Sequence, residues 1–143
     1  MLPNFSQLFP NLPNHSRVWL YLADRKLDAT EAQYVNEQIH HFLSNWAAHN
    51  KKLSCDGTLL FNQYLMLAVN EDIESASGCS IDSSVRFVKS LGAELAVDFF
   101  NRLNVMVLEN KEPIISSYLE AVEKKKIFIN PIITKLEELR EIY

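Results

Sequence analysis

The chain has 143 residues, a net charge of −4 at pH 7, 48% hydrophobic residues and 22% charged ones. This length and composition predict one globular domain with an ordinary core and exclude a disordered chain. The acidic balance argues against nucleic acid as a partner, because phosphate backbones are bound by basic surfaces.

Residues 1–16 are predicted to form an extended N-terminal arm. Pro3, Pro10 and Pro13 disfavour regular structure. The large apolar residues between them could hold the arm on a surface, and an unattached terminus fits equally well. No basic residue precedes these apolar residues, and the longest apolar run, residues 64–69, is far shorter than the roughly 20 residues of a membrane span. We therefore expect no signal peptide and no membrane partner.

A buried strand is predicted for residues 17–23, because apolar or aromatic residues occupy both of its faces. A helix should follow from Asp28, since Asp28 and Glu31 have the D-x-x-E spacing of a capping box. Apolar residues at steps of three and four continue this helix to about His49 and Asn50.

Two further strands are predicted over residues 53–61 and 64–69, joined by a tight turn at residues 62–63. A second helix should begin at Cys79 or Ser80 and stop at Gly92, which can adopt the left-handed conformation of a helix end. A short helix over residues 93–103 and a strand over residues 105–108 are expected to follow.

The C-terminal part is predicted to be helical. One helix is expected over residues 113–125, opening on Pro113, and another over residues 134–142, where Thr134 and Glu137 have the spacing of a second capping box. The apolar segment between them, residues 127–133, is hard for one domain of this size to cover. This segment is the reason to consider a homodimer.

The order of elements through residue 109 is strand, helix, strand, strand, helix, strand. This pattern predicts an α+β fold with a ferredoxin-like antiparallel sheet and helices on one face. A right-handed crossover would place the fourth strand beside the first. We therefore expect a single α+β domain over residues 17–143, with a core at 17–109 and a helical extension at 110–143.

This topology would bring Arg17, His49 and Cys79 to one end of the sheet. Small residues that include Gly78, Ser80 and Ser83 lead into the second helix, where free N–H groups can bind an anion. The same field favours the thiolate of Cys79, and His49 could serve as its base. Arg17 could hold a carboxylate or a phosphate.

A purely structural interpretation of the same residues is available. Serine and aspartate at a helix start cap the helix, and Asp82 in the first turn would compete with a bound anion. Glu37, His40 and His41 have helical ligand spacing, but no second motif completes a metal site. The two cysteines are too few for a disulfide framework or a zinc cluster, and they fit a reducing compartment.

The favoured hypothesis is a non-enzymatic cytoplasmic module that interacts with other molecules or binds a small anionic ligand, and that is able to self-associate. The alternative is a thiol-dependent enzyme or redox protein that uses Cys79 with His49. No phosphate-binding loop is present, and no cofactor is indicated.

Several stretches together resemble a family of small Bacteroidetes proteins that has no established activity. They are residues 17–25, Trp46 with His49, residues 76–87 and residues 97–102, and the most specific is A-S-G-C-S-I-D-S-S at residues 76–84. The resemblance spans residues 15–142. Members are often labelled ABC transporter ATPase, but this chain has no Walker motif. The resemblance therefore implies a bacterial cytoplasmic setting and assigns no catalytic or binding residue.

Overall fold

The computed structural model describes residues 4–109 and 112–142. The strands of these residues are β1 (Arg17–Leu22), β2 (Ala47–Ala48), β3 (Lys51–Lys52), β4 (Ser54–Leu60), β5 (Tyr64–Asn70), β6 (Asn104–Val107) and β7 (Ile114–Ser117). The helices are the 3-10 turn η1 (Phe5–Gln7), α1 (Ala29–Asn45), α2 (Gly78–Leu95), α3 (Tyr118–Glu123) and α4 (Leu136–Arg140).

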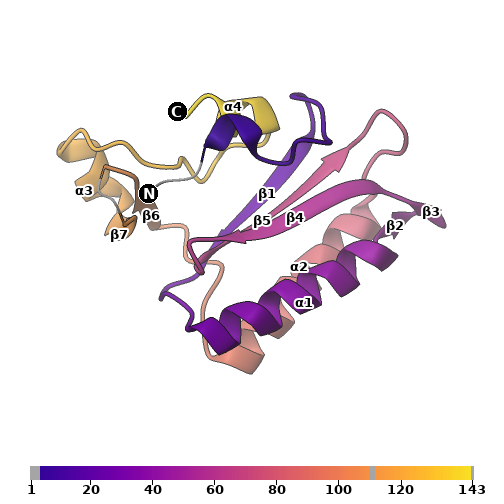
Figure 1. Cartoon of the computed structure of the whole chain (residues 1–143), viewed down its shortest axis with the longest axis horizontal. Coiled ribbons are helices and arrows are strands. Elements are labelled where there is room, and N and C mark those ends of the chain that lie inside the picture. Colours follow the sequence, from indigo (N-terminus) through magenta and orange to yellow (C-terminus); the bar gives the residue numbers. More distant parts are fainter. Residues whose placement is uncertain (1–3, 110–111, 143) are drawn as a thin grey trace.

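The main sheet is antiparallel and has the order β1-β5-β4. Residues 64–69 of the central strand β5 are buried, so this strand contributes to a core on each face of the sheet. Figure 1 shows α1 and α2 side by side beneath the sheet, with η1 and α4 above it. The α+β class and the antiparallel pairing are therefore confirmed.

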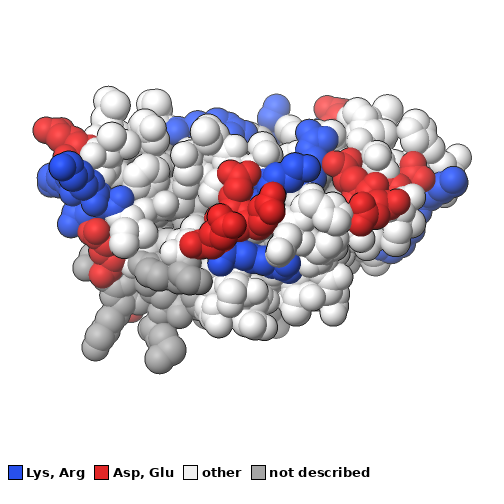
Figure 2. All heavy atoms as spheres, turned by 90° about the horizontal axis from the view of Figure 1, so that it is seen from above, with Lys and Arg blue, Asp and Glu red and all other residues white. Residues whose placement is uncertain are grey.

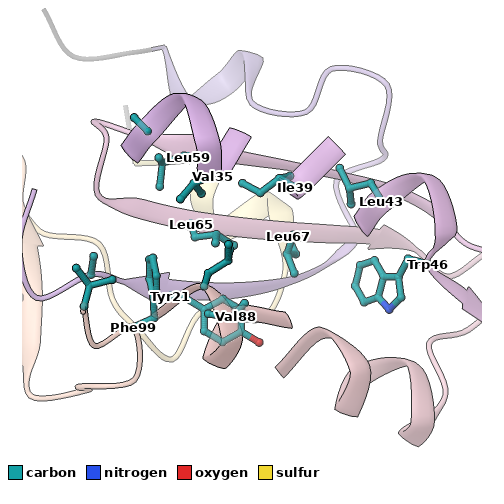
Figure 3. Packing of buried hydrophobic residues seen from close by; sticks show 14 of the residues in the cluster. Tyr21, Val35, Ile39, Leu43, Trp46, Leu59, Leu65, Leu67, Val88 and Phe99 are labelled. Carbon is teal, nitrogen blue, oxygen red and sulfur yellow. The ribbon is translucent and has the colours of Figure 1, made fainter. Parts of the chain in front are cut away.

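The first core lies between the sheet and the pair α1 and α2. Figure 3 shows Val35, Ile39 and Leu43 of α1 directed toward Leu65 and Leu67 of β5. The capping box predicted for α1 is present, with each partner's side chain bonded to the other's backbone N–H. Each large side chain buried in this way contributes about 2 kcal/mol.

The second core lies on the other face of the sheet and is formed by the two ends of the chain. Phe5, Phe9 and Leu12 of the N-terminal arm are buried there together with Ile129 and Leu136. The arm is therefore part of the core. It is also less extended than expected, because residues 5–7 form η1 and further turns follow.

The four-stranded ferredoxin-like sheet is not formed. β6 pairs with β7, a strand the sequence analysis missed, in a separate two-stranded sheet. The outer edge of β1 is instead approached at its start by the C-terminal segment, since the Val18 N–H donates to the Thr134 carbonyl at 3.0 Å. The place of the expected fourth strand is thus taken in part by a segment from the opposite end of the chain.

The predicted ends of both long helices were wrong. α1 ends at Asn45, and the chain turns back between β2 and β3 with His49 and Asn50 at positive φ. α2 continues through Gly92 to Leu95, and Ala96 takes the left-handed position. Gly92 has another role, because a Cβ there would lie 2.7 Å from the backbone oxygen of Val97.

The C-terminal extension contains less helix than expected. The helix predicted over residues 113–125 is divided between β7 and the six residues of α3. The last helix begins at Leu136 rather than at a Thr134 cap. In the part of the chain that the structure describes, no helix is both long and apolar enough to cross a bilayer. Figure 2 shows acidic and basic side chains next to one another in mixed groups on the face seen from above, with uncharged surface between the groups.

Candidate functional site

The start of α2 is organised by its own serines. Ser77 is the N-cap, and its hydroxyl accepts from the Ser80 N–H at 3.1 Å, where Cys79 or Ser80 had been predicted to cap. The Ser80 hydroxyl donates to the Ser77 carbonyl at 2.8 Å, and the Ser83 hydroxyl donates to the Ser80 carbonyl at 2.9 Å. A Cβ at Gly78 would meet no atom within 4 Å. The Ser77 oxygen therefore caps the helix, while the hydroxyl protons of Ser80 and Ser83 are directed at backbone carbonyls of the same turn.

Cys79 and His49 lie toward the same end of the main sheet. Cys79 is exposed in the first turn of α2, and β2, which leads to His49, packs against α2. The Trp46 indole also ties the two regions together, because its N–H donates to the Ser80 carbonyl at 2.8 Å. Within residues 4–109 and 112–142, no hydrogen bond or ion pair joins His49 to Cys79.

Arg17 begins β1 at this same end of the sheet. Its guanidinium lies over the ring of Trp19, 5.0 Å from the centroid. Trp19 in turn meets Trp46 edge to face, with the ring centroids 5.7 Å apart. Arg17 is thus connected to the start of α2 through two aromatic rings and the Trp46–Ser80 bond.

A cleft of about 140 Å³ runs along the outer edge of β1. One wall is β1 itself from Arg17 to Tyr21, and the opposite wall consists of residues 131–134. Arg102, from the loop between α2 and β6, also lines the cleft. We call this space the β1 cleft.

The two arginines of the β1 cleft differ from the others in their partners. Arg25 binds Glu31 in a bidentate ion pair, Arg86 pairs with Asp82, and Arg140 donates to backbone carbonyls. For Arg17 and Arg102, no carboxylate within the described ranges lies at ion-pair distance. The β1 cleft therefore holds two guanidinium groups without a counter-charge, in a chain that is acidic overall.

The charge of Arg102 affects the pKa values of two buried tyrosines, Tyr21 in the lining of the β1 cleft and Tyr64 of β5. Burial raises the pKa of Tyr21, whereas its hydrogen bond with Ser84 and the charge of Arg102 lower it. Burial also raises the pKa of Tyr64, again opposed by Arg102. Both phenols stay neutral at physiological pH, so they do not neutralise Arg102.

The sequence analysis identified Arg17 but missed Arg102. Arg102 is separated from Arg17 by 85 positions and belongs to no periodic pattern, so only the path of the loop after α2 reveals it. Among residues 4–109 and 112–142, no group of three or more His, Cys, Asp or Glu side chains is placed to hold a metal ion.

Comparison with known proteins returned no matching family model, curated protein or solved structure. The resemblance to the Bacteroidetes family stays a prediction.

Proposed function

We propose that this protein is a non-enzymatic module that binds small anionic ligands in the β1 cleft. The observation that carries the proposal is the pair of guanidinium groups, from Arg17 and Arg102, that line one cleft without a carboxylate partner among the described residues. A guanidinium presents a planar fork of donors that matches a carboxylate or a phosphate.

The walls of the β1 cleft also restrict the ligand. Trp19, Pro131 and Ile132 supply apolar surface, and polar groups contribute about as much of the lining. Such a lining suits a ligand with an apolar body and charged ends. The volume of about 140 Å³ is near that of cavities of roughly 150 Å³ known to hold benzene. We therefore expect the cleft to enclose a group of that size, which can be a small carboxylate, a phosphate ester or one part of a longer ligand, rather than a whole nucleotide.

Calorimetric titration with glutarate, adipate and inorganic phosphate tests the proposal. We expect at least one of these anions to bind and to raise the melting temperature, because it binds only the folded state. Arg17→Gln and Arg102→Gln should each weaken that binding about tenfold or more, as the loss of a charge-assisted bond implies. Arg86→Gln is the matched control, since it removes the same charge from the exposed side of α2.

Two results would contradict the proposal. One is that none of the three anions binds at millimolar concentration. The other is that the three arginine variants bind alike, which would mean that the anion responds only to net charge.

The exposed sulfur of Cys79 favours a second candidate, the thiol-dependent enzyme. Because no contact to His49 activates it, we expect Cys79 to react with iodoacetamide at the rate of an ordinary exposed thiol. It should still react faster than Cys55, which is half-buried and whose pKa is raised by burial. A Cys79 rate well above that of a peptide thiol, and reduced by His49→Gln, would support the enzyme instead.

Self-association is the remaining part of the proposal. The apolar segment expected to drive self-association, residues 127–133, is only partly exposed in the structure. Ile129 is buried in the second core, while Ile127 and Ile132 are 46% and 76% exposed. The reason to form a homodimer is therefore weaker than the sequence suggests. Light scattering that shows only monomer at high protein concentration would contradict the proposed homodimer.

A further inference from the structure

We infer that the ligand of the β1 cleft carries a peptide-like amide between two carboxylates and pairs with the free edge of β1 as a short added strand. This inference rests on the proposed function, because it specifies the chemistry of a ligand for the same two arginines. It identifies the partner class as a short, extended acidic peptide.

The first support is the direction of the β1 backbone groups. The Val18 N–H points away from β5, because it donates to the Thr134 carbonyl at 3.0 Å. In an antiparallel strand this direction repeats every second residue, so the N–H and C=O of Leu20 also point outward into the β1 cleft. No hydrogen bond to them is present among the described residues. Leu20 thus offers one donor and one acceptor.

The second support is that this edge already accepts a strand at its start. Lys135 forms an antiparallel bridge with Arg17, and the Leu136 N–H donates to the Ser16 carbonyl at 2.9 Å. The pairing ends at Thr134, because the residues before it form a turn at Asn130, whose side chain accepts from the Ile132 N–H at 3.1 Å and whose carbonyl accepts from the Ile133 N–H at 3.2 Å. The N–H groups of Ile132 and Ile133 are thus used within the turn, and the β1 cleft rather than a paired strand lies beside Leu20.

The third support is the position of the two charges along the edge. Arg17 lies at the start of the cleft-lining stretch of β1, and Arg102 acts on Tyr21 near its end. These ends are about 13 Å apart along the strand at roughly 3.3 Å per residue. A peptide residue opposite Leu20 would have neighbours whose side chains share one face about 7 Å apart. Acidic side chains at those two positions lie within reach of the long arginine side chains.

A peptide would use the β1 cleft in two ways. Its central residue would donate its N–H to the Leu20 carbonyl and accept from the Leu20 N–H, as in β-strand addition. Its two carboxylates would pair with Arg17 and Arg102, and its outer edge would face the wall formed by residues 131–134. Charge complementarity favours this occupant, because the β1 cleft has two positive groups and no negative one in its lining.

The test compares three probes of equal charge on the wild-type protein. They are acetyl-Glu-Ala-Glu-amide, the same peptide methylated on the alanine nitrogen, and heptanedioate, which has two carboxylates and no amide. We expect the unmodified peptide to bind roughly tenfold tighter than either of the others, because only it completes both backbone bonds. Hydrogen exchange gives a local readout, since the Leu20 N–H should be protected by the peptide, whereas the Val18 N–H, already bonded, should change little.

Each outcome decides between the two proposals. Tighter binding of the unmodified peptide, with protection of Leu20 that Arg17→Gln and Arg102→Gln reduce, supports the inference. If heptanedioate and the methylated peptide bind as tightly as the unmodified one, the added strand is wrong and the anion site stands. If none of the three binds, and glutarate, adipate and phosphate also fail, both proposals fall together.

Discussion

Arg140 of α4 forms hydrogen bonds to the N-terminal arm, whose apolar side chains are also buried in the second core. Its guanidinium donates to the carbonyls of Leu8, Phe9 and Leu12, at 2.7–3.1 Å, and to the Asn14 side chain at 2.6 Å. The bond to Asn14 is exposed, so its loss would be compensated by water. The three carbonyl acceptors are partly buried, and we assign about 1 kcal/mol to each.

We therefore expect Arg140→Ala to lower the free energy of unfolding by about 3 kcal/mol, or to lower the melting temperature by about 10 °C. Urea denaturation followed by tryptophan fluorescence measures the first quantity. Limited proteolysis should show cleavage within residues 4–14, because the carbonyls of the arm lose the guanidinium that donates to them. The β1-β5-β4 sheet keeps its own bonds.

Two controls sharpen this prediction. Arg140→Lys keeps the charge but loses the planar fork, so it should recover only part of the stability. Arg86→Ala removes an exposed arginine paired only within α2, and it should change stability by less than about 0.5 kcal/mol. An Arg140→Ala protein as stable as Arg86→Ala, with an arm equally resistant to protease, would refute the role assigned to this side chain.

Two further changes test the packing and the electrostatics of the helices. Gly92→Ala should destabilise the protein by about 2 kcal/mol in urea denaturation, because its Cβ would lie 2.7 Å from the Val97 carbonyl, whereas Gly78→Ala, with open space around it, should not. Acid titration should show a loss of stability between about pH 4.5 and pH 2, because the hydrogen bond from Arg25 lowers the pKa of Glu31 from 4.5 to about 2. A group with a depressed pKa stabilises the fold above its unfolded value and loses that effect as the pH falls, so Glu31→Gln should flatten this part of the curve. An unchanged curve would contradict the assignment.

Local signals in the sequence predicted several elements correctly. The start of α1 was predicted because Asp28 and Glu31 satisfy a helix terminus by themselves, without help from distant residues. The hairpin of β4 and β5 was also predicted, and Phe61 and Asn62 adopt the positive φ values that its tight turn needs. In each case the residues that determine the structure are neighbours in the chain.

Elements that depend on how the chain folds back on itself were missed or misplaced. Gly92 can end a helix, but the close approach of residue 97 keeps it inside α2. Residues 114–117 become β7 only because β6 lies alongside them. Both partners are near in the chain, but no periodic pattern in the sequence indicates that either contact forms.

The sequence by itself determined the α+β class, the cap of α1, the strands of the main sheet and the choice of Arg17 as a candidate site residue. These features follow from periodicity and local hydrogen bonding, which involve only residues that are close together in the chain. Only the tertiary structure decided that the two chain ends cover the second face of the sheet, that β6 pairs with β7 rather than with β1, and that Arg102 lines the same cleft as Arg17. The physical reason is that burial and edge pairing are settled between segments far apart in the chain, by which of them covers apolar surface and unbonded backbone groups best.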